Sequence, residues 1–293
     1  FLKKEFGIKN VSIESKGNNL KNVVNFIRIY KNSAQLIIFE KMLKKGLINA
    51  NIKLNFDEDG KIKKNYQVKG LVKDVEIRLL NNDILSNIDF NFDVKKKLYS
   101  IKSAKIQYKG INFLSKEIQI TPPKFSGRDL QIEGDISHKT INLDSEQLSI
   151  FFKQGSENLK HVKLSSDNSF KLYIKKNKIK SYHIDSKIKL DKLNYKIDQA
   201  KLKEYIPNFK GSIDFEDHEI KLRTEKDVFI VQGEGNYIIG TQREKINYKI
   251  RLLRNESNHL SYETKININE SPLNIEFLNY QKKENKDSTL FID

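Results

Sequence analysis

Apolar and polar residues alternate along most of this chain, above all between residues 45 and 120. A period of two over short runs predicts β-strands with one apolar and one polar face. The segments DEDGK, LLNND and DVKKK between these runs have the composition of turns, so we expect an antiparallel meander. The residues that share the apolar face in three of the runs are Ile48, Ala50, Ile52, Leu54 and Phe56, then Val75, Ile77 and Leu79, then Ile88, Phe90, Phe92 and Val94.

Two segments have apolar residues at helical rather than strand spacing. Residues 33–45 predict a short amphipathic helix, with Ser33 as its N-cap and Gly46 just beyond its end. A second short helix is expected near residues 198–208, again shortly before a glycine, Gly211. The segment NVVNFIRIY at residues 22–30 fits either a strand or the start of a helix, and the pattern leaves both open.

Strand pairing is expected to break at Pro122 and Pro123 and then to resume. Because the order helix, glycine, strands occurs twice, we expect two modules, residues 1–136 and residues 137–293. Strands about ten residues apart fit a closed barrel, a sandwich or an open elongated sheet. The later runs expected as strands are LQIEGDI, INLDSEQLSIFF, FKLYIKK, YHIDSKIKLDKLNYKID, GSIDFEDHEIKLR, DVFIVQGEGNYIIG, KINYKIRLL, LSYETKININ and LNIEFLNY.

The charge of the chain first indicates a polyanion or an anionic membrane surface, because the net charge is +16. The lysines, however, are spread over all the strands, and no pattern typical of a nucleic-acid-binding motif accompanies them. Solvated polar strand faces explain the charge better, so no nucleic-acid partner is expected. No run approaches the roughly 20 apolar residues of a membrane-spanning helix.

The residue types that carry catalysis are sparse or badly spaced. The absence of cysteine excludes a disulfide, a thiolate metal site and a cysteine nucleophile. Ser186 and Lys189 form an SxxK in a strand-like run, where the lysine would not lie beside the serine. Gly233, Gly235 and Gly240 precede no helix, so they indicate a bulge or close sheet contact rather than a phosphate-binding loop.

The histidines are not spaced as metal ligands, and each is expected to be a surface residue. The acidic residues Glu216, Asp217 and Glu219 around His218 are expected at a solvated hairpin tip. We therefore expect no enzyme, no cofactor and no metal site. The five histidines are His138, His161, His183, His218 and His259.

The apolar face itself is the remaining candidate for function. If the sheet curls without closing, its inner surface is a trough for acyl chains, whose burial gains about 25 cal/mol per Å². A lysine-rich rim could then meet phosphate-bearing head groups. Periodicity alone equally allows the same face to be the filled core of a sandwich.

The stretch LIIFEKMLKKGLINANIKLNF, with YQVKGLVKDVEIRLL and LYSIKSAKIQYKGINF after it, resembles the central repeats of AsmA-like proteins of the YhdP and TamB type. The resemblance is closest over residues 33–136. It departs from the family at the end of the helix, where tryptophan is common; Phe39 or Met42 would have to take that place.

The resemblance implies an elongated, curved, taco-like open sheet with an apolar groove. Such a groove carries phospholipid acyl chains between the inner and outer membranes and supports outer-membrane integrity. The chain would then be a periplasmic middle fragment of a longer protein, anchored in the inner membrane of a diderm bacterium and reaching both membranes through parts beyond its ends. It implies no cofactor and no catalytic residue.

The residues expected to line the groove belong to the apolar strand faces. An error of one residue in register would turn them to the other face. The alternative function is a structural or adhesive β-rich surface protein with a filled sandwich or solenoid core. The expected lining residues are Ile52, Leu54, Val75, Ile77, Phe90, Phe92, Ile106, Tyr108 and Ile132.

Overall fold

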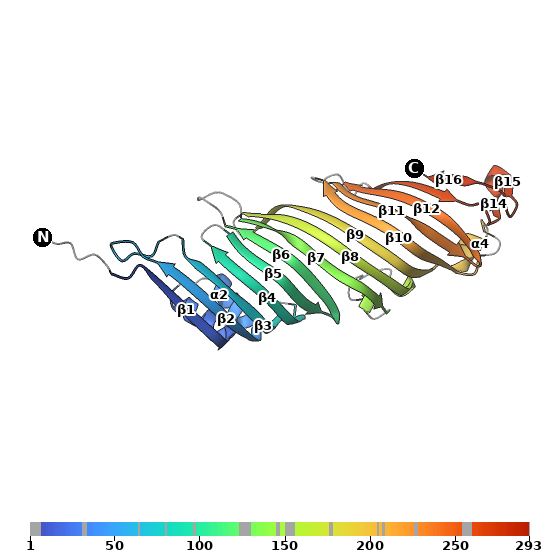
Figure 1. Cartoon of the computed structure of the whole chain (residues 1–293). Coiled ribbons are helices and arrows are strands. Elements are labelled where there is room, and N and C mark those ends of the chain that lie inside the picture. The colour runs from blue at the N-terminus through green and yellow to red at the C-terminus, as the bar shows by residue number, and fades with distance from the viewer. Residues whose placement is uncertain are drawn as a thin grey trace. The chain divides into compact units, whose positions relative to one another are not determined.

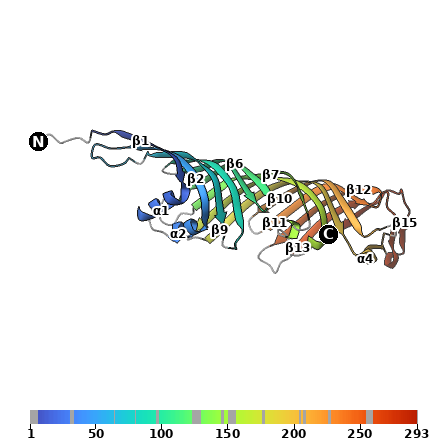
Figure 2. The ribbon, with the colours of Figure 1, turned by 90° about the horizontal axis from the view of Figure 1, so that it is seen from below.

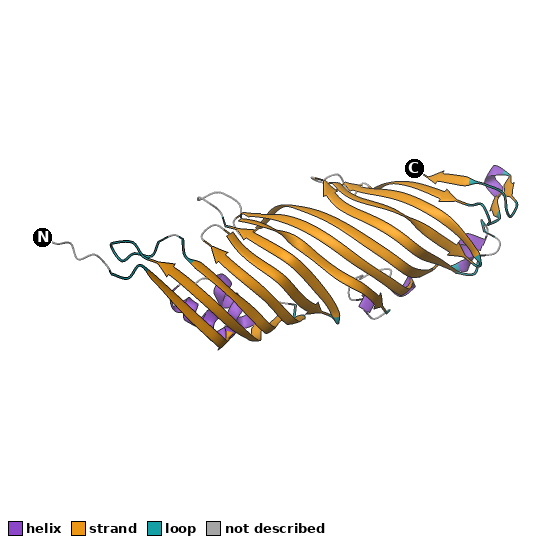
Figure 3. Ribbon diagram, viewed as in Figure 1, coloured by secondary structure: helices purple, strands orange, loops and turns teal. Residues whose placement is uncertain are grey.

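The structure is a computed structural model, and its strands form a long antiparallel meander in one open sheet, as the alternation predicts (Figures 1 and 3). This sheet has 14 strands in the order of the sequence, β1 to β13 and then β16, and a two-stranded sheet joins β14 to β15. The structure describes residues 7–30, 34–63, 65–79, 81–95, 98–122, 130–144, 147–149, 156–175, 178–203, 205–206, 209–225, 228–253 and 260–292.

The strands between the predicted turns have nearly the predicted bounds. In the first half of the chain they are β1 (Asn10–Asn19), β2 (Leu43–Asn55), β3 (Gln67–Arg78), β4 (Ile84–Lys95), β5 (Leu98–Tyr108), β6 (Ile111–Thr121) and β7 (Leu130–Leu143). In the second half they are β8 (Leu159–Lys175), β9 (Lys178–Lys196), β10 (Ser212–Glu225), β11 (Val228–Ile239), β12 (Gln242–Leu253), β13 (Leu260–Asn267), β14 (Leu273–Ile275), β15 (Tyr280–Lys282) and β16 (Thr289–Ile292).

The chain divides into two compact units. Unit 1 comprises Phe1–Ser137 and Phe170–Tyr182, and unit 2 comprises His138–Ser169 and His183–Asp293. Each unit has its own apolar cluster and its own helix against that cluster.

In unit 1, strand β1 is followed by helix α1 (Leu20–Tyr30) and helix α2 (Ala34–Met42). The Asn19 side chain caps α1 by accepting hydrogen bonds from the backbone N–H groups of Lys21 (2.9 Å) and Asn22 (3.3 Å). Leu20 and Val24, one turn apart, form the buried stripe of α1. An ion pair between Arg28 and Glu40 ties the two helices together, and both helices lie against β2 (Figure 2).

The structure corrects three predicted elements. The first expected helix ends at Met42, because Leu43 already pairs with Ile77 as part of β2; its expected cap Ser33 lies outside the described residues. The run INLDSEQLSIFF is a strand only as far as Leu143, and residues 147–149 are helical. The run LNIEFLNY is a hairpin of β14 and β15 joined by a 3₁₀ turn.

Gly46 is also placed differently from the prediction, since it lies within β2 rather than just after a helix. Its φ of +152° is a conformation that favours glycine, and a Cβ atom there would lie 2.6 Å from Cγ2 of Val75. Gly211, with φ +86°, follows the second expected helix, α4, which spans only Gln199–Lys203. Gly46 therefore serves a close chain passage beside the apolar cluster of unit 1, whereas Gly211 is favoured by its positive φ angle alone.

β-Bulges interrupt several strands and shift the alternation between faces. In β3 and β4, Asp74 and Asn87 have positive φ angles (52° and 49°) at the register shifts. The Asp74 N–H donates to the Asp89 carboxylate at 2.9 Å, so a side chain from the next strand satisfies a backbone group that the bulge frees. Bulges increase local twist and bend a strand, which a flat period-two pattern does not reveal.

Candidate functional site

A ladder of apolar residues crosses the sheet of unit 1 from β1 to β7. Directly paired residues on neighbouring antiparallel strands point to the same face. All members of the ladder are at least partly exposed, and Ile13 is 45% exposed. Successive pairs join Ile13, Ile52, Val68, Val94, Tyr99, Ile120 and Ile132.

All the expected groove residues lie on the face that carries this ladder. Ile52 and Ile132 belong to the ladder itself, and Leu54 is two residues along β2 from Ile52. The remaining residues follow from the pairs of Val75 with Ile88, Ile77 with Leu85, Leu85 with Tyr108, and Val68 with Val94, together with their neighbours two residues away. Their role as a lipid-groove lining stays a prediction.

Helix α1 covers one part of this face. Leu20 and Val24 of α1 join Leu43, Val72, Val75 and Ile88 in a buried cluster. Val75 is only 2% exposed, so this expected lining residue packs under the helix. The other expected residues that pack against the cluster are Ile77, Phe90, Phe92 and Ile106. Ile52, Leu54 and Ile132 lie outside the cluster, on the more open part of the face.

Tyr108 ends β5 in a polar contact. Its hydroxyl donates to Asp83 at 2.8 Å, and the Lys109 ammonium lies 2.6 Å from the other Asp83 oxygen. These hydrogen bonds, that of Lys109 first, lower the pKa of the Asp83 carboxyl, and the bond to Asp83 raises the pKa of Tyr108. The ionised carboxylate of Asp83 therefore connects the turn between β3 and β4 to the turn between β5 and β6.

In unit 2, two glycines of β11 lie beneath aromatic rings. Gly233 pairs with Tyr248, and a Cβ atom at Gly233 would overlap the Tyr248 ring. A Cβ atom at Gly235 would overlap His218 in the same way. The expectation of a close sheet contact at these glycines is thus confirmed for Gly233 and Gly235.

His218 corrects the expectation of a surface residue. It lies within β10 beside a bulge at Asp217 and is 2% exposed, with its ring 5.6 Å from that of Phe215. Nε2 is 2.9 Å from the Asn236 carbonyl oxygen. The bulge turns the histidine onto the apolar face, whereas the acidic residues around it stay with the strand rather than at a hairpin tip. His161 and His183 are exposed as expected, His138 is partly buried, and His259 lies outside the described residues.

A second apolar feature of unit 2 is a cavity of about 380 Å³. Its floor is formed by the sheet, for example Phe215 of β10 and Ile246 of β12. Its roof is formed by the segment that includes α4 and by β14. The residues that line it are Leu202, Tyr205, Ile206, Ile213, Phe215, Tyr237, Ile239, Ile246, Ile266, Ile268, Ser271, Leu273, Ile275 and Leu290.

Two buried charges hold the loop that leads into this roof. Glu244, 4% exposed, accepts hydrogen bonds from the backbone N–H groups of Glu270 (2.6 Å) and Ser271 (3.3 Å). Lys282, 7% exposed, donates to the carbonyl oxygens of Asn269 (3.0 Å) and Ser271 (2.7 Å). These hydrogen bonds offset the cost of burying the two charged side chains and hold the loop between β13 and β14.

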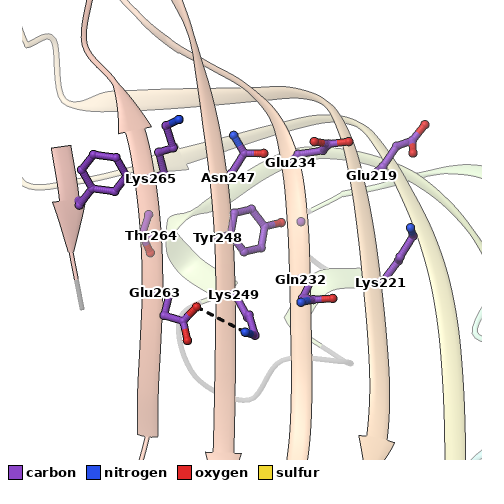
Figure 4. Close-up of a pocket in the computed structure, with 12 residues that line it drawn as sticks. Glu219, Lys221, Gln232, Glu234, Asn247, Tyr248, Lys249, Glu263, Thr264 and Lys265 are labelled. Atoms are coloured by element: carbon purple, nitrogen blue, oxygen red, sulfur yellow. Dashed lines mark hydrogen bonds and ion pairs between the residues drawn. The ribbon is translucent and has the colours of Figure 1, made fainter. Parts of the chain in front are cut away.

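The polar face of unit 2 carries a shallow depression of about 520 Å³ (Figure 4). It has carboxylates and ammonium groups side by side, and Lys249 lies 3.4 Å from Glu263. Lys265 lies over the Phe291 ring at 5.7 Å. Such a mixed, solvated surface offers no cluster of one charge, which agrees with the expectation that the lysines belong to polar strand faces.

The described residues contain no group of three or more histidine, aspartate or glutamate side chains placed to hold a metal ion. They also contain no helix with the length and hydropathy needed to span a bilayer.

Comparisons with protein-family models, with curated proteins and with solved structures found no match for this chain. The AsmA-like resemblance and the function that it implies therefore stay predictions. The cavity in unit 2 was not expected from the sequence. The signal that leads to it is the expected second helix, because Leu202 and Ile206 fall within that predicted segment and form part of the roof.

Proposed function

We propose that this chain is a non-enzymatic lipid-binding module whose open apolar sheet face holds phospholipid acyl chains. The observation that carries the proposal is the apolar ladder of unit 1, which runs through partly exposed residues on adjacent strands. Contiguous apolar surface of this kind is rare on soluble proteins unless it serves an interaction. The described strands include no second large sheet that could bury it.

The chemistry of this face fits hydrocarbon better than a polar ligand. Its ladder offers aliphatic and aromatic groups without a charge, and burying such surface yields about 25 cal/mol per Å². The polar face carries the charges instead, as in the contacts of Asp93 with Lys69 (3.7 Å) and Lys95 (3.6 Å). The resemblance to AsmA-like proteins extends the proposal to lipid transfer between the inner and outer membranes of a periplasm.

The test compares two variants of strand β2 that introduce the same charge on opposite faces. Ile52→Asp places a carboxylate in the ladder, and Asn51→Asp places one on the polar face. A lost isoleucine contact of about 1.5–3 kcal/mol predicts roughly tenfold to hundredfold weaker lipid binding for Ile52→Asp. Native mass spectrometry with lipid extraction of the purified proteins measures the bound phospholipid.

Asn51→Asp should retain the phospholipid of the unmodified protein. Phe90 is a less suitable position, because it packs against the cluster under α1 and its loss would also affect stability. Equal lipid content in Ile52→Asp and the unmodified protein would overturn the proposal. A lipid-free unmodified protein that Ile52→Asp strongly destabilises would instead favour the structural or adhesive role with a filled core.

A further inference from the structure

The cavity of unit 2 offers an incoming ligand almost no hydrogen bond. The hydroxyl group of Tyr237 donates to the Asn267 carbonyl oxygen at 2.6 Å, and that of Ser271 donates to Gln242 Oε1 at 2.8 Å. These two hydroxyl protons are thus used within the protein. Tyr205, 38% exposed, carries the third hydroxyl of the lining, and the other lining residues are aliphatic or phenylalanine. A polar or charged group entering the cavity would lose its water without compensation.

The cavity is roofed on one side and continuous with the sheet face on the other. The two parts of the roof, β14 and the segment that includes α4, are joined by a hydrogen bond of 2.9 Å from the Asn274 N–H to the Tyr205 carbonyl oxygen. Its floor continues along β12 from Ile246 to Tyr248, two residues further on the same face. A flexible chain lying on this face can therefore pass its end beneath the roof.

We infer that this cavity holds the methyl-terminal end of one lipid acyl chain. The inference rests on the proposed function and adds that unit 2 binds the tail of the lipid rather than its head group. A volume of about 380 Å³ lies within the range of ligand pockets. Burial of each further methylene group favours binding, and the roof limits how far the chain can enter.

The test uses the fact that the chain contains no tryptophan, so one introduced tryptophan reports on one place. Phe215→Trp places the reporter in the cavity, Tyr99→Trp in the ladder of unit 1, and Asn247→Trp on the polar face of unit 2. The probes are two phosphatidylcholines with bromine, which quenches tryptophan fluorescence on contact, near the methyl end or near the head group of one acyl chain.

The expected result is several-fold stronger quenching of Phe215→Trp by the lipid brominated near the methyl end than by the other lipid. Tyr99→Trp should be quenched by at least one of the lipids, and Asn247→Trp by neither. Quenching of Tyr99→Trp without any at Phe215→Trp would overturn the cavity assignment and leave the proposed function standing. No quenching at either position would overturn both, and equal quenching of Phe215→Trp by the two lipids would overturn the tail-end orientation.

A second variant separates a binding site from a packing void. Leu273→Phe adds volume from the roof into the cavity without a polar atom. If the cavity receives an acyl chain, this variant should bind phosphatidylcholine several-fold more weakly while its unfolding midpoint stays equal or rises. Unchanged lipid binding with a raised midpoint would show that the space is a packing void and would overturn the inference.

Discussion

At the scale of single residues, His218 is a buried group whose ionisation the fold opposes. Burial lowers its pKa, against smaller opposite effects of the hydrogen bond to the Asn236 carbonyl and of the Asp217 carboxylate. Its ring faces Phe215, Gly235 and Tyr248, which carry no charge. The folded protein thus keeps this histidine neutral at pH values where the unfolded chain begins to protonate it.

This difference predicts a loss of stability in acid. The unfolded pKa is 6.5, and the folded pKa is lower, so below pH 6.5 the unfolded state binds more protons. The contribution of neutral His218 to the free energy of unfolding is complete above the unfolded pKa. It falls as the pH drops, by at most about 1.4 kcal/mol per pH unit. Urea unfolding of the unmodified protein and of His218→Gln at a series of pH values measures it.

His218→Gln should have a flatter dependence of unfolding free energy on pH between neutrality and mild acid. His161→Gln is the matched control, because it removes an exposed histidine of the same unit instead of a buried one. Identical slopes for the unmodified protein and His218→Gln would contradict the assignment of His218 as the neutral buried group.

Residue-scale prediction from the sequence succeeded where alternation is uninterrupted. Ile52, Leu54 and Ile132 could be assigned to one face because each lies in a run whose period of two has no bulge within it. His218 could not, since an extra residue at the Asp217 bulge turns it from the expected polar face to the apolar one. A bulge depends on pairing with neighbouring strands, and a single strand's sequence does not record it.

At the scale of elements, helix α1 is what distinguishes the covered part of the unit 1 face from its open part. Its segment fitted a strand or a helix, because the apolar residues at 23, 24, 26, 27 and 29 match parts of both periods. The Asn19 cap and the contacts of Leu20 and Val24 with the sheet select the helix. Tertiary packing therefore decided what local propensity left open.

We expect α1 to stabilise unit 1 through its buried stripe alone. Leu20→Ala removes a side chain that is 9% exposed within the cluster and should lower the unfolding free energy by about 2–5 kcal/mol. Ile29→Ala alters a side chain of the same helix that is 78% exposed and should change it by less than about 0.5 kcal/mol. Denaturant unfolding measures both, and equal effects would mean that α1 is not docked as described.

At the scale of the whole molecule, the net charge of +16 and the apolar face predict opposite responses to salt. Binding through phosphate contacts of a polyanion weakens steeply as salt rises, by about 10³–10⁵ between roughly 50 and 200 mM for 6–10 contacts. Binding of acyl chains by apolar contact has no such dependence. The sequence showed the charge and the alternation but could not say which of them meets a ligand, because that depends on which face stays uncovered.

We therefore expect the affinity for a zwitterionic phosphatidylcholine to change less than about twofold between roughly 50 and 200 mM salt, since no counterions are released on binding. Titration of the lipid into the Tyr99→Trp variant at several salt concentrations measures this affinity. Double-stranded DNA is the matched polyanion probe, and any association with it should vanish over the same range. If lipid affinity instead falls as steeply as a polyanion contact does, the lysines of the polar faces carry the binding, and the apolar ladder does not.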